Sequence, residues 1–169
     1  IGLAAGFDKS AEVYNSLFKL GFGFIEVGTI TPRPQTGNTK PRIFRLEEDK
    51  AMINRLGFNN DGMEAVSERL ENYPPEDFLG INVGPNKDTK DKIYDFIKCF
   101  DQLNKSANYI TINISSPNTE GLRDFHEEKL LSNLLSKLNE LKKIKKIKCP
   151  LVLKISPDID EKEISNINE

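Results

Sequence analysis

Short apolar segments alternate with longer amphipathic segments along most of this chain. The apolar segments have the length and composition of buried strands, and they occupy residues 1–5, 24–27, 78–83, 109–114 and 151–155. Helical periodicity is found at residues 62–71, 88–103 and 127–147, and a shorter helix is predicted after Ser10. Apolar strands that alternate with helices favour a parallel sheet covered by helices. We therefore predict an α/β fold, and the strand spacing is consistent with a partial (β/α)8 TIM barrel of about the first five strands.

A doubly wound parallel sheet is the alternative α/β architecture. Its Gly-x-Gly-x-x-Gly phosphate-binding pattern is absent after the first predicted strand, so the barrel is favoured. Five strands would not close an eight-stranded barrel. A helical pattern that opens at Asp158 is also unfinished at Glu169. We therefore expect residues 1–169 to form one incomplete barrel domain, as a fragment of a longer protein.

The pattern changes between the second predicted strand and the helix at 62–71. Pro32, Pro34 and Pro41 disfavour a helix in this stretch. Residues 42–46 and 51–54 then alternate like the two arms of a small β-hairpin. Because long ordered loops in compact domains usually carry function, this excursion is a candidate functional segment.

Composition excludes several classes of function. The formal net charge of −2 gives no support for a nucleic-acid partner. Cys99 and Cys149 lie far apart and form no metal-binding or redox motif, so we expect two free thiols and no metal site. His126 is the one histidine and lies among charged residues, which predicts a surface position rather than a place in a Ser-His-Asp triad.

Polar residues follow or interrupt each predicted strand near its carboxyl end. They are Lys9, Thr29, Asn82, Asn113, Ser116, Asn118 and Lys154. A single asparagine after a strand usually shapes a turn or caps a helix. Several polar residues at equivalent strand ends instead favour a ligand site, because the carboxyl ends of barrel strands share one mouth. Lys154 lies within an apolar run, where a buried lysine needs an anion or an electron-rich ring beside it.

Two further segments could contribute to the same mouth. The small residues Ala4, Ala5 and Gly6 would let a flat ligand approach the backbone closely. Phe58, which follows Asn54 by four positions, could place a ring over the mouth, although packing in the core explains a phenylalanine nearly as well.

Five segments together resemble the dihydroorotate dehydrogenase family. They are residues 4–9, 28–35, 42–46, 53–60 and 113–123. The resemblance runs in order over nearly the whole chain. Ser116 stands where the cytosolic class of the family has a cysteine, so the chain resembles the membrane-associated, quinone-reducing class.

The resemblance implies an FMN-dependent oxidoreductase of de novo pyrimidine biosynthesis. Such an enzyme oxidises dihydroorotate to orotate and passes the electrons to a quinone. The resemblance also implies a place at the mitochondrial inner membrane, with membrane association through an N-terminal helical region outside this chain. The later barrel strands, which bind the FMN phosphate in the family, would also lie outside it. We expect this fragment by itself to be inactive.

The resemblance also implies roles for individual residues. Ser116 would be the base that removes the C5 proton of dihydroorotate, with Thr119 and Phe58 beside the proton's path. The substrate would contact Lys9, Asn54, Arg55, Leu56, Gly57, Phe58, Asn113 and Asn118. FMN would contact Ala4, Ala5, Gly6, Lys9, Thr29, Asn82, Asn113 and Lys154. Arg45 would lie near the quinone tunnel.

Three alternatives remain open on the sequence. The first is a cytosolic-type relative with another electron acceptor, against which Ser116 argues. The second is a phosphate-binding barrel that works without flavin. The third is an inactive fragment that binds a partner.

Overall fold

The sheet that organises this protein has four parallel strands in the order β1-β4-β5-β6. The computed structural model describes residues 1–159, 164, 165 and 167. The sheet strands are β1 (Ile25–Ile30), β4 (Leu79–Val83), β5 (Tyr109–Asn113) and β6 (Leu151–Lys154). The main helices are α2 (Gly62–Asn72), α3 (Lys92–Leu103) and α4 (Glu128–Lys145). A 3-10 helix, η1 (Arg123–His126), precedes α4.

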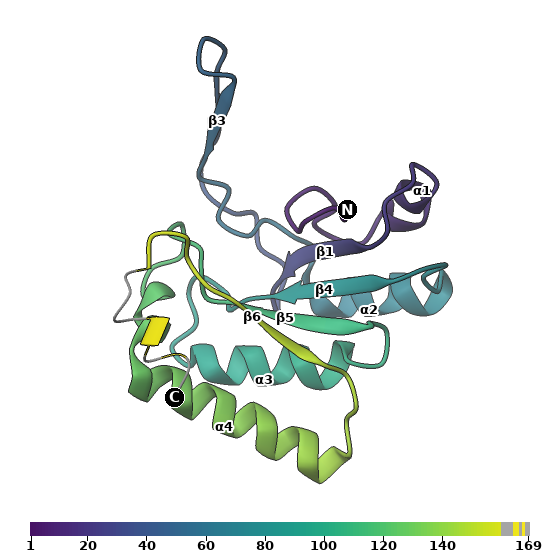
Figure 1. Ribbon diagram of the computed structural model, residues 1–169, viewed down its shortest axis with the longest axis vertical. Coiled ribbons are helices and arrows are strands. Elements are labelled where there is room, and N and C mark those ends of the chain that lie inside the picture. Colours follow the sequence, from purple (N-terminus) through teal and green to yellow (C-terminus); the bar gives the residue numbers. More distant parts are fainter. Residues whose placement is uncertain (160–163, 166, 168–169) are drawn as a thin grey trace.

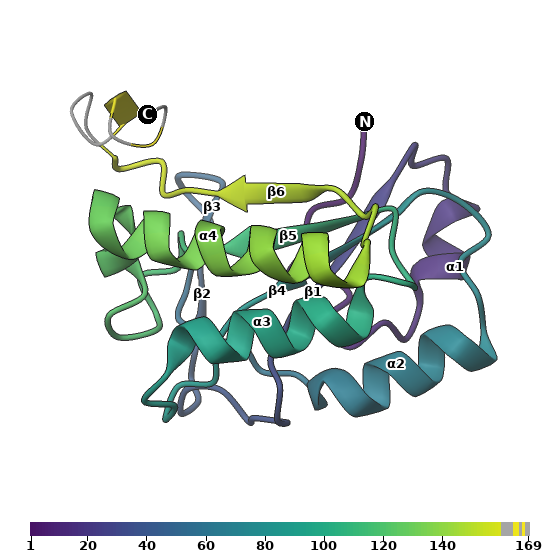
Figure 2. The same cartoon turned by 90° about the horizontal axis from the view of Figure 1, so that it is seen from below.

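The helices α2, α3 and α4 lie along one face of this sheet (Figure 1, Figure 2). Successive sheet strands along the chain are also neighbours in space. A doubly wound sheet would carry helices on both faces and would reverse its strand order. Within the described part of the chain, the arrangement is therefore that of a barrel segment, as predicted.

The two faces of the sheet differ in chemistry. The helix-covered face carries Ile25, Val27, Leu79, Ile81, Val83, Ile110 and Ile112, all of them buried in the core. Alternation along the strands puts Glu26, Asn82, Thr111 and Asn113 on the opposite face. In a barrel this second face is the interior. The inner face of the strands is therefore polar along its length, with Glu26 and Thr111 adding to the polar residues predicted near the strand ends.

The predicted first strand at residues 1–5 is reduced to one parallel bridge between Leu3 and Ile25. The Leu3 carbonyl accepts a hydrogen bond from the Glu26 amide, so the segment still follows the edge of β1. The chain then turns at Gly6, where φ is +113°, a conformation that favours glycine. Residues 1–5 therefore run along β1 without forming a strand of the sheet.

The helix predicted after Ser10 is short, and Ser10 does not cap it. Helix α1 covers only Tyr14–Phe18. The Ser10 hydroxyl accepts a hydrogen bond from the Asp61 amide across the structure. The Asp8 carboxylate instead accepts bonds from the amides of Glu12 and Val13, at 2.8 and 2.9 Å. The segment before α1 is therefore an irregular loop closed by Asp8.

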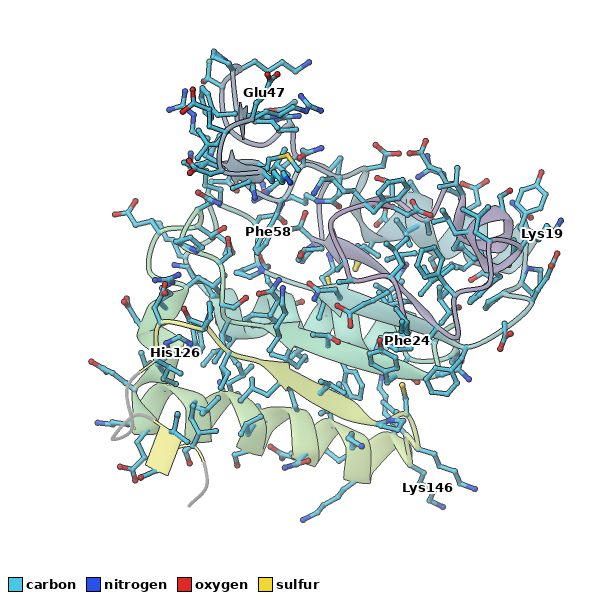
Figure 3. The ribbon with its side chains drawn as sticks, turned by 45° about the horizontal axis from the view of Figure 1, so that its top comes forward. Lys19, Phe24, Glu47, Phe58, His126 and Lys146 are labelled. Atoms are coloured by element: carbon cyan, nitrogen blue, oxygen red, sulfur yellow. The ribbon has the colours of Figure 1, made fainter. Side chains whose placement is uncertain are left out.

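The predicted hairpin is confirmed. Strands β2 (Ile43–Leu46) and β3 (Ala51–Asn54) pair in antiparallel register, and every one of their residues is exposed. The hairpin rises away from the sheet, with Glu47 at its tip (Figure 1, Figure 3). It contributes no residue to the buried core cluster of the described chain.

Two further sequence expectations concern single residues near the core. Cys99 and Cys149 are free, as expected, and both are buried. His126 is buried rather than on the surface, at 6% exposed, and its Nε2 accepts a bond from the Ser156 amide at 3.5 Å. The prediction was wrong because η1 folds under the loop after β6. The helix predicted from Asp158 falls largely outside the described residues.

Candidate active site

A cleft of about 430 Å³ opens at the carboxyl ends of the sheet strands. The residues predicted for a site that line it are Ala5, Gly6, Lys9, Thr29, Asn54, Leu56, Gly57, Phe58, Asn113, Ser116, Asn118 and Lys154. They come from the N-terminal loop, β1, the base of the hairpin, and the loops after β5 and β6. The cleft therefore gathers side chains that are distant in sequence.

Five predicted site residues stand outside the described lining of this cleft. Ala4 is exposed beside it, and Arg45 lies on the exposed hairpin. The Arg55 guanidinium donates to the Pro41 carbonyl and lies 5.7 Å from the centre of the Phe44 ring, so it points toward the hairpin. Thr119 and Asn82 are both buried, at 3% and 0% exposed.

Sequence reasoning missed four residues that line the cleft: Ser115, Pro117, Arg123 and Pro157. The Ser115 hydroxyl donates to Asn113 Oδ1 at 2.9 Å, and the Arg123 Nε donates to the Ser115 carbonyl. Three of the four flank or follow Ser116 within the segment 113–123, which was the signal that could have found them.

Buried amides form a hydrogen-bonded network beneath the cleft. The Asn113 Nδ2 donates to Asn82 Oδ1 at 3.0 Å and to Thr29 Oγ1 at 3.1 Å. The Thr29 hydroxyl also donates to Asn82 Oδ1, at 2.7 Å. Since buried polar groups are costly when unpaired, this mutual pairing fixes the orientation of each group. Asn82 thus supports Thr29 and Asn113, which line the cleft, from below.

Glu26 anchors this network to the inner face of the sheet. Its carboxylate accepts bonds from Asn82 Nδ2 at 2.8 Å, from the Thr111 hydroxyl at 2.8 Å and from the Tyr109 hydroxyl at 3.1 Å. Burial, and then the negative charge of Glu26, raise the pKa of Tyr109 well above its ordinary value. The phenol therefore stays protonated and donates to the carboxylate.

The loop that carries Ser116 is tied to its surroundings at several points. The Asn118 amide donates to the Ser116 Oγ at 3.2 Å, and Asn118 Nδ2 lies 3.5 Å from the Asn54 carbonyl at the end of β3. Arg123 forms an ion pair with Asp158 in the loop after β6, at 3.1 Å. These contacts hold the partly buried Ser116 hydroxyl at the cleft wall.

Two lysines line the cleft in different environments. Burial, and then the positive charge of Arg42, lower the pKa of Lys9 from its ordinary value. Lys154 pairs in register with Asn113 but is exposed, so the prediction of a buried lysine is wrong. Its strand lies at the edge of the described sheet, and Val152 on the same face is exposed too.

The chemistry of this cleft suits a flat, polar, electron-accepting ring. A Cβ at Gly6 would meet no atom within 4 Å, so the backbone is open to a ligand there. Lys9 and Lys154 supply positive charge, and Thr29 and Asn113 supply fixed polar groups. A ring that gains negative charge on reduction would be stabilised by such donors.

In βα-barrel enzymes the active site lies at the carboxyl ends of the strands, which is where this polar cleft opens. The fold and the position of the cleft therefore place the chain among the βα-barrel enzymes. A family model described as dihydroorotate dehydrogenase matches residues 1–169, and the chain belongs to this family.

Relatives with curated names agree with this assignment. The chain is 55% identical over 173 residues to the "Dihydroorotate dehydrogenase (quinone)" of Bartonella henselae, covering 100% of this chain and 48% of that protein. It is 50% identical over 172 residues to the "Dihydroorotate dehydrogenase (quinone), mitochondrial" of Cyclocybe aegerita, covering 99% of this chain and 52% of that protein. The chain spans about half the length of the curated relatives it matches.

Solved structures give the same answer for the fold. The crystal structure of the enzyme from Eimeria tenella in complex with ferulenol superposes with a TM-score of 0.91 at 42% identity, covering 98% of this chain and 51% of that one. The ligand-free structure from the same organism also gives 0.91, at 40% identity. The predicted family and the predicted partial barrel are both confirmed.

Proposed function

We propose that the complete protein oxidises dihydroorotate to orotate in de novo pyrimidine biosynthesis, with FMN as hydride acceptor and a quinone as final electron acceptor. The observation that carries this proposal is the convergence of Lys9, Asn54, Asn113, Ser116 and Asn118 on one cleft. Dihydroorotate offers a carboxylate and planar amide edges. A lysine and three asparagines match those groups in charge and hydrogen-bonding pattern.

In this proposal the cleft residues divide between binding and proton transfer. Lys9 binds the substrate carboxylate, and Asn54, Asn113 and Asn118 bind the amide edges. The backbone of residues 55–57 borders the same substrate. Ser116 takes the proton from C5, and the Asn118 amide that donates to its Oγ favours the deprotonated hydroxyl.

A serine hydroxyl is a weak base, so its proton must move onward. We assign that path to Thr119, which is buried at the end of the same loop. The Phe58 ring at the cleft wall would exclude water from it.

The cofactor side of the cleft would be formed by the residues nearest the open backbone at Gly6. Ala4, Ala5 and Gly6 would border the flavin ring, and Lys9, Thr29, Asn113 and Lys154 would bind its polar edges. Asn82 would act through its bonds to Thr29 and Asn113. Bound FMN would supply the capacity to accept a hydride from the substrate.

We also propose that the quinone approaches along the hairpin near Arg45, and that the protein is associated with the mitochondrial inner membrane. The name of the Cyclocybe aegerita relative supports the mitochondrial part. Among the described residues, no helix combines the length and the apolar character needed to cross a membrane.

The substitution Ser116→Ala in the complete protein tests the proposal. We expect the rate of flavin reduction by dihydroorotate to fall about 100-fold or more, with FMN still bound, because general base catalysis contributes that much. Stopped-flow absorbance of the flavin measures the rate. Ser67→Ala is the control, because it removes a buried serine hydroxyl on α2 that donates to Glu71 and lies outside the cleft lining. An unchanged rate in Ser116→Ala, or a wild-type protein that holds no flavin, would refute the proposal.

A further inference from the structure

The segment that joins the hairpin to α2 contains a left-handed turn at the cleft. Gly57 has φ +72° and Phe58 has φ +53°. Glycine adopts this conformation readily, whereas a phenylalanine does so rarely because its Cβ approaches the backbone. Both residues line the cleft. Surrounding structure must therefore hold Phe58 in a conformation that it would not choose by itself.

Two side-chain amides hold this turn through its carbonyl groups. The Gln35 Nε2 donates to the Gly57 carbonyl at 3.0 Å, and the Asn60 Nδ2 donates to the Phe58 carbonyl at 2.8 Å. Gln35 and Asn60 also exchange two backbone hydrogen bonds of 3.0 Å each. The orientation of both peptide units in the turn is thus fixed from the side away from the cleft.

The two amides are in turn anchored to the barrel. The Gln35 Oε1 accepts bonds from Asn86 Nδ2 at 3.0 Å and from the Lys87 amide at 3.1 Å, both in the loop after β4. The Asn60 Oδ1 accepts bonds from the amides of Thr31 and Gly62. Asn60 and Asn86 are both buried. The position of the turn is therefore fixed by residues that follow β1 and β4, and not by the exposed hairpin.

The ring of Phe58 packs against the backbone of Gly84, directly after β4. A Cβ on Gly84 would lie 2.9 Å from Phe58 Cε2 and 2.8 Å from Thr29 Cγ2. Only a residue without a side chain lets the ring lie this close to the backbone. Figure 3 shows Phe58 between the hairpin and the sheet. The ring is thus fixed from below by Gly84 and from behind by the held turn.

We propose that Gln35 and Asn60 are positioning residues, which set the rate of substrate oxidation by holding the left-handed Gly57–Phe58 turn and thereby the Phe58 ring at the cleft. This inference rests on the proposed function. Neither amide lines the cleft itself among the described residues, so both act through Phe58. Loss of either bond lets the turn relax toward a right-handed or extended conformation and moves the ring.

The near-isosteric substitutions Gln35→Glu and Asn60→Asp test the inference in the complete protein. Each keeps an oxygen acceptor and removes the donor to the turn carbonyl. Asn60→Asp also removes the bond from Nδ2 to the Thr31 hydroxyl oxygen at 2.9 Å. We expect flavin reduction by dihydroorotate to slow about 10- to 100-fold, since small displacements near a reacting centre have effects of that size. The dissociation constant of dihydroorotate should change less than the rate. Lys87→Met is the control, because its Nζ binds Asn38 Oδ1 in the loop after β1, and the substitution keeps the Lys87 backbone bond to Gln35 and both bonds to the turn.

A double-substitution cycle separates positioning from general loosening of the loop. In a Phe58→Leu background, Gln35→Glu and Asn60→Asp should change the rate by less than about twofold, because the ring they hold is gone. Gly84→Ala, which would crowd both the ring and Thr29 Cγ2 and leaves both amides in place, should slow the same step. The inference would be overturned if Gln35→Glu and Asn60→Asp slowed the step as much in the Phe58→Leu background as in the wild type. It would also be overturned if these two substitutions left the wild-type rate unchanged. A wild-type protein without dihydroorotate-dependent flavin reduction would instead overturn the proposed function.

Discussion

Replacing Asn82 by leucine should destabilise the fold strongly, although no surface contact changes. Asn82 is fully buried on β4 and bonds to Thr29, Asn113 and Glu26. Leucine has a similar shape but neither donates nor accepts. The Thr29 hydroxyl then loses its acceptor, whereas Asn113 keeps Thr29 as a partner.

The size of the loss follows from the groups left behind. A buried hydroxyl without an acceptor costs about 1 to 3 kcal/mol. The lost bond to the Glu26 carboxylate costs about 1.5 to 3 kcal/mol, because its acceptor is charged. The apolar leucine recovers part of this by its own burial. We expect the free energy of unfolding to fall by about 2 to 5 kcal/mol.

Urea denaturation of the complete protein, followed by far-UV circular dichroism, measures this change. Thr111→Val is the comparison variant, because it removes one bond to Glu26 and leaves that carboxylate with Asn82 and Tyr109. Its effect should be the smaller of the two. A loss below about 1 kcal/mol for Asn82→Leu, or one no larger than that of Thr111→Val, would refute the reasoning from buried hydrogen bonds.

Two further predictions concern pH. Because burial and Arg42 lower the pKa of Lys9, its ammonium is lost at a lower pH than that of an ordinary lysine. Binding of dihydroorotate, the proposed substrate, should therefore weaken as pH rises through this lowered pKa. Arg42→Gln should move this loss of binding to higher pH, as measured by dihydroorotate titrations monitored through flavin absorbance. If the pH dependence of binding did not shift, the effect of the Arg42 charge on Lys9 would be excluded. Burial raises the pKa of Asp95 above 3.8, its ordinary value, against the opposing bond from the Asn86 amide. The folded state therefore binds more protons between these two pKa values, and stability should fall as pH rises through that window. Asp95→Asn should remove this pH dependence of stability, measured as the urea midpoint across acidic pH. If the variant kept the same pH dependence, a group other than Asp95 would be responsible.

Periodicity alone was sufficient to predict the sheet and its main helices. The four sheet strands and α2, α3 and α4 all lie where apolar repeats placed them. The segment before α1 could not be predicted in the same way, because Asp8 and Ser10 have partners that depend on the fold. Ala11 there has φ +54°, which no local pattern indicates. Local sequence predicts helices and strands well where apolar residues recur at a regular period. It predicts poorly a loop whose conformation depends on side-chain hydrogen bonds to other parts of the fold.

The candidate site was predictable to the extent that strand ends converge. Lys9, Asn113 and Ser116 were found because polar residues at equivalent strand ends share one mouth in a barrel. Glu26 was missed, since a single carboxylate in a strand usually faces solvent, whereas here it faces the barrel interior. Gln35 was also missed as part of the site's support, because its partners are 22 and 51 residues away along the chain.

The hairpin of β2 and β3 has a consequence for how such a protein can diversify. None of its eight strand residues belongs to the packed interior, and only Asn54 among them lines the cleft, so substitutions at the other seven leave the scaffold and the cleft beneath it undisturbed. Natural variation can therefore remodel the projecting part of the hairpin, away from Asn54. Relatives that share one reaction centre are free to differ in what they meet outside it.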